Sequence, residues 1–338
     1  MKTRIAISVS LIVVALAMAN LLPIQAQKPI NQPVQAGAEL RMQPPKLDAG
    51  ARRNPLKIAL LHWYLADTAT AFPVGNQPYG LCFDGANIWT ANFAGNNVTK
   101  IRASDGQLLG TFDVGGQPFG VTFDGANVWA SNEVDNTVTK LRASDGKTLG
   151  TFRTGTFPGW TAFDGQSLWV PNARDNTVSK LRTTDGKILG TFAVGNSPAA
   201  IAFDGANVWV TNDGSSSVTK LRALDGAVLG TFGVGTNPLG IAFDGANIWV
   251  ANRNSNTVTE LRASDGVVLG TFPVPANGPY GVVFDGTYIW VSGDSSLVIL
   301  RASDGAQVAS RKLSSVGVAF DGAYVWTAET NNNRVLKF

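Results

Sequence analysis

Short runs of apolar residues alternate with polar residues along most of the chain, and they return in the same order about every forty residues. Between residues 78 and 115 the apolar positions fall in four such runs, and Gly, Asp, Asn or Ser residues bound each of them. The runs are 79–83, 88–92, 98–103 and 108–114. Such runs, rich in β-branched and aromatic residues, are typical of β-strands. The pattern predicts four antiparallel strands in each repeat.

One tryptophan recurs in every repeat, so the number of these tryptophans gives the number of repeats. It stands at Trp89, Trp129, Trp169, Trp209, Trp249, Trp290 and Trp326, at intervals of 40, 40, 40, 40, 41 and 36 residues. A unit of this size is too short to enclose its own core and must bury its apolar surface against its neighbours. Four-stranded repeats with a large aromatic residue in each are typical of β-propellers. We therefore expect an all-β, seven-bladed β-propeller with four antiparallel strands per blade, in which these tryptophans pack between blades.

The turns and the chain ends predict how the ring is built and closed. Two Asp-Gly pairs in each repeat, such as Asp84-Gly85 and Asp105-Gly106, place glycine where a tight hairpin needs positive φ. Residues 70–75 correspond to residues 110–115 one repeat later, and residues 335–338 correspond to a third strand. We expect an N-terminal strand to complete the C-terminal blade. Residues 56–64 also match the register of that third strand, and the pattern leaves both possibilities open.

The first residues of the chain differ in composition from the repeats. Residues 1–26 combine Lys2 and Arg4 with a following apolar run, which predicts a signal peptide; a retained membrane anchor is the alternative. Residues 27–55 are rich in Pro and Gln and predict a flexible leader before a propeller spanning 56–338. We expect a secreted or periplasmic protein, a monomer with no stable membrane insertion after cleavage. The only cysteine, Cys82, lies on an innermost strand and predicts a buried, inert thiol.

Charge gives little support for a nucleic-acid partner. The chain has 27 Lys and Arg against 24 Asp and Glu, and it contains no dense basic block. Lys100 and Arg102 alternate on a third strand and recur in later repeats, so that they would form a basic ring suited to a polyanion. Each of these repeats also carries Asp in both turns, and we therefore favour local pairing of these charges. Glu260 interrupts the series.

One face of the propeller varies from repeat to repeat, and loops on a rigid scaffold are where binding usually resides. Its loops after the second strand differ in every copy, and the residue that precedes them is Asn in five copies, in a position where it would also cap loop backbone. Trp160 stands where the other copies have glycine or alanine, next to aromatic residues at the start of the innermost strands. The candidate binding residues are Tyr79, Phe119, Trp160, Tyr280, Asn132, Asn172, Arg174 and Arg253.

The repeat resembles a known family of propellers. The segment Phe-Asp-Gly-Ala-Asn-Ile-Trp-Val at 243–250, together with Asn-Thr-Val-Thr-Lys-Leu-Arg at 136–142, is similar to the forty-residue YVTN-type repeats of secreted bacterial propellers, which are related to NHL repeats and to the streptogramin B lyase propeller. The resemblance spans about residues 66–338 and implies the fold. It implies no catalytic residue, because the lyase uses histidine and glutamate with magnesium, and the only histidine here, His62, precedes the repeats.

Two functions of different classes follow from these features. The first is an exported, non-enzymatic binding or scaffold propeller that takes a protein or small-molecule ligand on its varied face, with no cofactor and no metal. The second is a metal-dependent lyase or hydrolase with Mg²⁺ or Ca²⁺ held by carboxylates of that face. Those carboxylates are Glu133, Asp135, Asp175, Asp213, Asp294 and Glu329. We favour the first function because the repeats show no set of acid, base and nucleophile.

Overall fold

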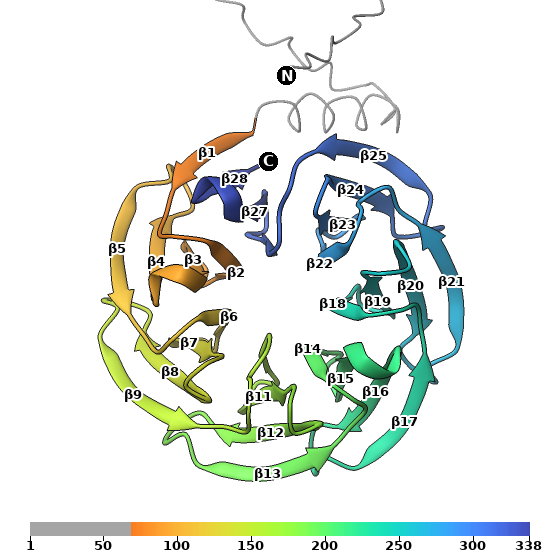
Figure 1. The fold of residues 1–338 in the computed structure, drawn as a ribbon, viewed down its shortest axis with the longest axis horizontal. Coiled ribbons are helices and arrows are strands. Elements are labelled where there is room, and N and C mark those ends of the chain that lie inside the picture. Colours follow the sequence, from red (N-terminus) through yellow and green to blue (C-terminus); the bar gives the residue numbers. More distant parts are fainter. Residues whose placement is uncertain (1–68) are drawn as a thin grey trace, which may run out of the picture. The chain divides into compact units, whose positions relative to one another are not determined.

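The computed structural model describes residues 69–338, which form seven four-stranded antiparallel sheets arranged around a central axis (Figure 1). In six of these blades the strands follow one another in sequence order from the axis outward, as in β2-β3-β4-β5 (Pro78–Phe83, Asn87–Asn92, Asn97–Arg102, Leu108–Asp113). The seven-bladed, all-β fold predicted from the repeat is thereby confirmed. Within the described residues, no helix is long and apolar enough to span a bilayer.

The remaining strands repeat this order with small changes in length. They are β6 (Pro118–Phe123), β7 (Asn127–Asn132), β8 (Thr137–Arg142), β9 (Thr148–Arg153), β10 (Ala162–Phe163), β11 (Ser167–Asn172), β12 (Thr177–Arg182), β13 (Ile188–Ala193), β14 (Pro198–Phe203), β15 (Asn207–Asn212), β16 (Ser217–Arg222), β17 (Val228–Gly233), β18 (Pro238–Phe243), β19 (Asn247–Asn252), β20 (Thr257–Arg262), β21 (Val268–Pro273), β22 (Pro279–Phe284), β23 (Tyr288–Gly293), β24 (Ser296–Arg301), β25 (Gln307–Lys312), β26 (Val318–Phe320), β27 (Val325–Glu329), β28 (Arg334–Lys337) and β1 (Thr70–Pro73). Short 3-10 turns, η1 (Phe93–Gly95), η2 (Asp213–Ser215) and η3 (Thr330–Asn332), follow three of the second strands.

The seventh blade joins the two ends of the propeller, in the order β1-β28-β27-β26 (Figure 1). Thr70 pairs with Lys337 and Phe72 pairs with Val335 across the antiparallel β1 and β28. The predicted closure by an N-terminal strand is confirmed, and β28 is the third strand of this blade. Residues 56–64, the other candidate for that strand, lie outside the described residues, as do His62, the predicted signal peptide 1–26 and the leader 27–55.

The core lies between blades, where each repeated tryptophan packs against the next sheet. Trp89 is fully buried and packs with Val121 and Val128 of the second blade. Its indole N–H donates to the carboxylate of the turn residue Asp84, five residues earlier, at 2.7 Å. The same bond recurs in all seven blades, at 2.7–2.8 Å. The indole N–H of a buried tryptophan needs an acceptor. The Asp of the turn therefore both shapes the turn and accepts the hydrogen bond of the buried indole.

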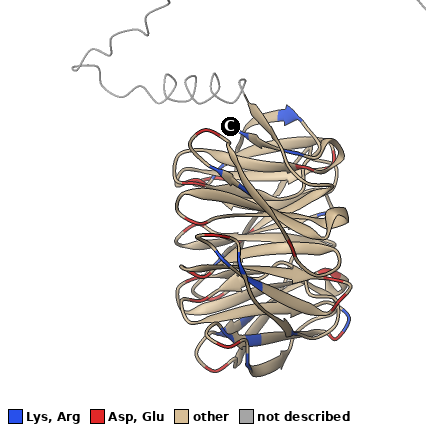
Figure 2. Cartoon of the chain, turned by 90° about the vertical axis from the view of Figure 1, so that its left-hand side faces the viewer, with Lys and Arg blue, Asp and Glu red and all other residues tan. Residues whose placement is uncertain are grey.

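The lysines of the third strands join neighbouring blades and do not form a basic surface. Lys100 is buried, lies 5.1 Å from the centre of the Trp89 ring and donates to the carbonyl of Ala143 in the next blade. Arg102 pairs with Asp105 at 2.9 Å, and the equivalent arginines pair likewise, which confirms the local pairing we favoured. Figure 2 shows acidic and basic residues interspersed over the blades. The alternative of a basic ring is therefore wrong.

The backbone explains the recurring glycines. The glycine of the first turn has φ between 92° and 103° in every blade, as the Asp-Gly pairs predict; the residues are Gly85, Gly125, Gly165, Gly205, Gly245, Gly286 and Gly322. A different constraint acts at the axis, where innermost strands of adjacent blades approach each other closely. A Cβ on Gly80 would lie 2.7 Å from the carbonyl oxygen of Phe119. Glycine is required there by space and not by φ.

Candidate functional site

The third blade departs from the others at the start of its innermost strand. Five blades place an aromatic or aliphatic residue before the close-approach glycine, as in Tyr79-Gly80, whereas the third reverses the pair to Gly159-Trp160. A Cβ on Gly159 would collide with the carbonyl oxygen of Ala199. In this blade Gly159 is therefore the glycine at which the innermost strand approaches the next blade closely. The innermost strand β10 is only two residues long, and the Trp160 N–H donates instead to Ala199 of the fourth blade at 2.9 Å. The reversal moves an indole ring to the mouth of the channel.

Aromatic rings from three blades form a continuous row at this mouth. Phe93 stacks on Tyr79 with ring centres 4.9 Å apart, and Tyr79 lies 5.3 Å from Phe119. Phe119 in turn lies 4.6 Å from Trp160, with the two planes at 45°. Offset and tilted pairs at these separations stabilise each other beyond the area they bury. The row therefore presents a rigid apolar wall.

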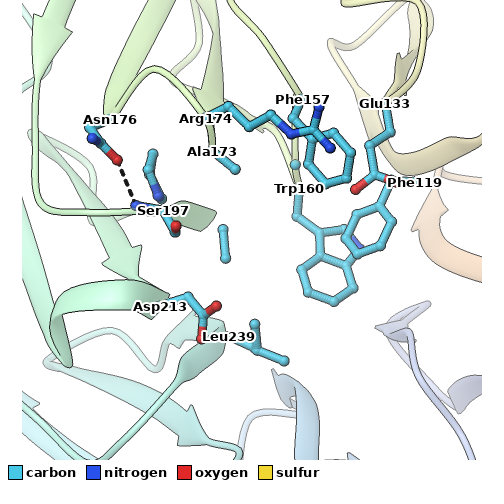
Figure 3. Close-up of a pocket in the computed structure, with 13 residues that line it drawn as sticks. Phe119, Glu133, Phe157, Trp160, Ala173, Arg174, Asn176, Ser197, Asp213 and Leu239 are labelled. Carbon is cyan, nitrogen blue, oxygen red and sulfur yellow. Dashed lines mark hydrogen bonds between the residues drawn. The ribbon is translucent and has the colours of Figure 1, made fainter.

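A pocket of about 450 Å³ opens beside this wall, among the second, third, fourth and fifth blades (Figure 3). Its volume lies in the range that holds small organic ligands. Phe119, Phe157, Trp160 and Leu239 supply its large apolar surfaces, and its charged side chains are Glu133, Arg174 and Asp213. Trp160 also borders the central channel, where a second cavity of about 100 Å³ is lined by inner-strand residues such as Leu81 and Ile201.

Glu133, which follows β7 directly, is the unusual charged group of the pocket. Its residue is 8% exposed, and among residues 69–338 its carboxylate accepts no hydrogen bond and forms no ion pair. Burial raises the pKa of Glu133 to about 7, although Arg174 acts in the opposite direction. Desolvation thus outweighs the nearby guanidinium. A buried carboxyl aimed into a pocket, without a partner, is available to a ligand.

The other carboxylates of the varied face have partners. Asp135 accepts from the Gly116 N–H at 2.7 Å, Asp175 from Thr156 N–H at 2.6 Å and Asp213 from the Asn237 amide at 2.6 Å, while Asp294 pairs with Arg253 at 3.3 Å and Glu329 pairs with Arg334. Among residues 69–338, no group of three or more His, Cys, Asp or Glu side chains is arranged to hold a metal ion.

Phe157 has a backbone conformation that a bulky side chain rarely adopts. Its φ is 63°, in the left-handed region. The equivalent positions are also left-handed, but they carry Gln77, Gln117, Ser197, Asn237 and Asn277. The Phe157 ring stacks under the Arg174 guanidinium, 4.4 Å from its centre, and both side chains line the pocket. Strain of this kind persists where the surroundings impose it and often marks a functional site.

The structure brings some of the predicted site residues together and separates others. Phe119, Trp160 and Arg174 line the pocket, and Tyr79 extends its aromatic wall. Tyr280 lies under Arg253, 4.5 Å from the guanidinium. Burial is the largest cause that raises the pKa of both tyrosines, and Tyr79 also raises the pKa of Tyr280.

Two predicted residues face the interior of their blades. Asn132 and Asn172 are fully buried. Asn172 accepts from the Gly155 N–H at 3.0 Å and donates to Thr177 at 3.0 Å, and Asn132 makes the matching bonds. These bonds cap loop backbone, which was the alternative we gave for the recurring asparagine, and they leave neither side chain on the pocket surface.

Three residues that lie at this pocket or its aromatic wall were not indicated as ligand contacts by the sequence. Glu133 was considered only as a metal ligand, and Phe93 and Phe157 were not considered. A signal for Phe157 exists in the sequence, since it is the one aromatic residue in a series of Gln, Ser and Asn. Cys82 is half-buried against the second-blade core, and burial raises the pKa of its thiol.

No protein-family model matches the chain, and no curated protein matches it in sequence. Solved structures share its fold. A hydrazine synthase chain of Kuenenia stuttgartiensis is similar with a TM-score of 0.68 and 19% identity, over 78% of this chain and 95% of that one. A streptogramin B lyase is similar with a TM-score of 0.68 and 18% identity, over 80% of this chain and 96% of that one. A catalytically inactive virginiamycin B lyase from Staphylococcus aureus, solved with quinupristin, is similar with a TM-score of 0.68 and 19% identity, over 80% of this chain and 98% of that one. At these identities the likeness establishes a shared propeller fold.

Proposed function

We propose that the protein is an exported binding propeller that takes a small-molecule ligand, without chemistry, in the pocket at its channel mouth. The observation that carries this proposal is the convergence, in one pocket, of the aromatic wall with the unpartnered Glu133 carboxyl. Pockets that bind small molecules are concave and mostly apolar, with a few polar groups that orient the ligand. The apolar run of the first 26 residues supports export.

The departures from the repeat support the same proposal. The reversed pair at Gly159-Trp160 and the aromatic side chain at the left-handed position 157 both lie at this pocket, and the fold itself does not need them, because the other six blades form without them. Features that break a local rule gather where function outweighs stability. A binding role explains why both are found in one blade.

A metal-dependent lyase or hydrolase is the second candidate, and Glu133 is the observation that favours it. A carboxyl whose pKa is about 7 has the right affinity for protons to act as an acid or base near neutral pH. Five of the six carboxylates that this function would draw on have local partners. Calorimetric titration with Mg²⁺ and with Ca²⁺ separates the two functions: saturable binding of either ion favours the enzyme.

Affinity selection tests the binding proposal directly. The purified protein is incubated with a metabolite mixture, and the small molecules it retains are identified by mass spectrometry. We expect Trp160→Ala to lose the retained molecules with little change in Tm, because Trp160 is half-buried at the pocket and not in the core.

Trp209→Ala is the matched control, because Trp209 is fully buried between blades. It should lower the free energy of unfolding by about 3–5 kcal/mol. If Trp160→Ala causes a loss of that size, or retains the same molecules as the unaltered protein, the pocket is not the binding site.

A further inference from the structure

We propose that the pocket selects an organic cation, namely a protonated amine attached to a flat apolar group. The ammonium would bind the Glu133 carboxylate, and the flat group would lie against Phe119 and Trp160 (Figure 3). This inference rests on the proposed function and adds the chemical class of the ligand.

The balance of charge in the pocket favours a cation. Two carboxylates, Glu133 and Asp213, line it against the single guanidinium of Arg174. Arg174 does not neutralise Glu133, since the two form no ion pair and burial dominates the environment of the carboxyl. Asp213 accepts one hydrogen bond, from Asn237. A buried carboxylate without a partner is costly, and a bound ammonium would remove that cost.

Aromatic rings in the pocket and elsewhere on the same face already contact cations. The Arg174 guanidinium lies 4.4 Å from the centre of Phe157, and the Arg253 guanidinium lies 4.5 Å from the centre of Tyr280. Cations within about 6 Å of a ring face are attracted by its quadrupole. Trp160 and Phe119 offer further ring surface at the pocket, 4.6 Å apart. A ligand cation at Glu133 would therefore meet a carboxylate and aromatic rings together.

Groups from several elements face Glu133 and set how binding depends on pH. Arg174 projects from the loop after β11, Tyr79 from β2 interacts with Glu133 electrostatically, and Asp213 follows β15 on the far wall. Asp135, on the Glu133 loop itself, is exposed and bonded to Gly116. Glu133 is the group whose ionisation changes near neutral pH, because its pKa is about 7.

Calorimetry with three probes of one shape tests the inference: 2-phenylethylamine, the neutral 2-phenylethanol and the anionic phenylacetate. We expect saturable binding of the amine at pH 8 and at least tenfold weaker binding of the alcohol and the acid. Amine binding should weaken about tenfold for each pH unit below about 7, as Glu133 takes up its proton, until it reaches the affinity of the neutral side chain.

Variants identify the group responsible. Glu133→Gln keeps the shape of the side chain and removes its charge, and we expect it to weaken amine binding about tenfold to a hundredfold at pH 8 and to abolish the pH dependence. Asp145→Asn is the control, because Asp145 is an exposed turn residue of the same blade, paired with Arg142. It should leave binding unchanged.

Each of the other outcomes overturns the inference. Equal binding of amine and alcohol, lost in Trp160→Ala but kept in Glu133→Gln, would leave a binding pocket without selection for cations. Tighter binding of phenylacetate would assign the pocket to anions through Arg174. No saturable heat from the amine would reject this ligand class, and the affinity selection described above would decide separately whether the pocket binds anything.

Discussion

At the scale of single residues, Phe157 combines a strained backbone with a side chain in the pocket. A non-glycine residue held in an unfavourable backbone region costs on the order of 1–3 kcal/mol, and its stack on exposed Arg174 returns about 0.5–1 kcal/mol. The strain outweighs the stack. Selection for stability alone would favour the asparagine found at the equivalent positions Asn237 and Asn277.

Phe157→Asn should therefore bind ligand less well while folding at least as stably. We expect the free energy of unfolding, measured with urea, to stay constant or rise by on the order of 1 kcal/mol. Binding of the retained small molecules should weaken, because one ring of the pocket is lost. A fall in stability of about 2 kcal/mol or more would show that Phe157 serves the fold.

The buried carboxyl of Glu133 predicts an effect of pH on stability. Its pKa rises from 4.5 in the unfolded chain to about 7 in the folded protein, through burial. The folded state therefore binds the proton more tightly, and the stability this contributes is present below pH 4.5 and lost as pH rises through 7. Glu133→Gln, which stays neutral, should match the unaltered protein in Tm at pH 4 and exceed it at pH 8. An equal Tm at both values would contradict the raised pKa.

The site could be predicted only where a residue's type, compared with the equivalent residues of other repeats, indicated its role. Trp160 drew attention because tryptophan replaced glycine in a strict repeat, and it does line the pocket. The recurring Asn172 was ambiguous, since an amide serves a ligand or a loop equally well, and only its bonds to Gly155 and Thr177 show that it caps. Glu133 gave no signal, because whether a carboxyl is partnered depends on neighbours from other blades.

At the scale of elements, a lysine in five of the seven third strands forms a contact between sheets. Lys100, Lys140, Lys180, Lys220 and Lys337 each donate to a carbonyl of the following blade, at 2.6–2.7 Å. The fifth blade has Glu260 at this position and the sixth has Ile299. Glu260 is buried and accepts a hydrogen bond from the Asn247 amide at 2.8 Å. Burial, and to a smaller extent the charge of Asp244, raises the pKa of Glu260. The interface of the fifth and sixth blades therefore lacks the lysine contact.

Glu260→Lys should strengthen that interface. A lysine there would reach the carbonyl of Ala302, the counterpart of Ala143, and would replace repulsion from Asp244 with attraction. We expect a gain in the free energy of unfolding on the order of 1–2 kcal/mol, because a hydrogen bond from a charged donor forms while the bond to Asn247 is lost. Glu260→Gln separates the two effects, since it removes the repulsion only. Equal stability of the lysine and glutamine variants would show that the contact adds nothing.

The strands themselves were predictable because the same pattern of apolar and turn residues recurs along the chain in seven repeats. Runs such as 88–92 combine alternation with bounding turn residues, and the structure has Asn87–Asn92. The third blade shows the limit. The reversed pair at Gly159-Trp160 marked a departure, but the shortening of the innermost strand to Ala162–Phe163 follows from the close approach of Ala199, a contact between blades that no repeat within one chain reveals.

At the scale of the whole molecule, closure depends on four residues distant in sequence from their partners. β1 covers the outer edge of β28, and Phe72 packs with ring centres 5.6 Å from Trp326. The Val74 N–H donates to the carbonyl of Asn333, and the Gln77 N–H to its side chain, which joins the end of the last blade to the start of the first. The repeat register predicted this pairing, because a propeller can place its first and last strands in one sheet.

Removal of β1 should open this blade. We compare a chain that begins at residue 76 with a chain that begins at residue 69, so that the two differ only in β1 and the residues just after it. Without β1, the outer backbone groups of β28 lose their partners and the partly buried Phe72 no longer covers Trp326, which forfeits up to about 1.5–3 kcal/mol for the side chain alone. An unpaired edge strand also invites pairing with another chain. We expect the shorter chain to unfold at a lower urea concentration and to elute as dimers or larger species in size-exclusion chromatography. Equal unfolding midpoints with monomeric elution of both chains would mean that the ring holds without its closing strand, and that the contacts of β26 and β27 with the first blade are enough.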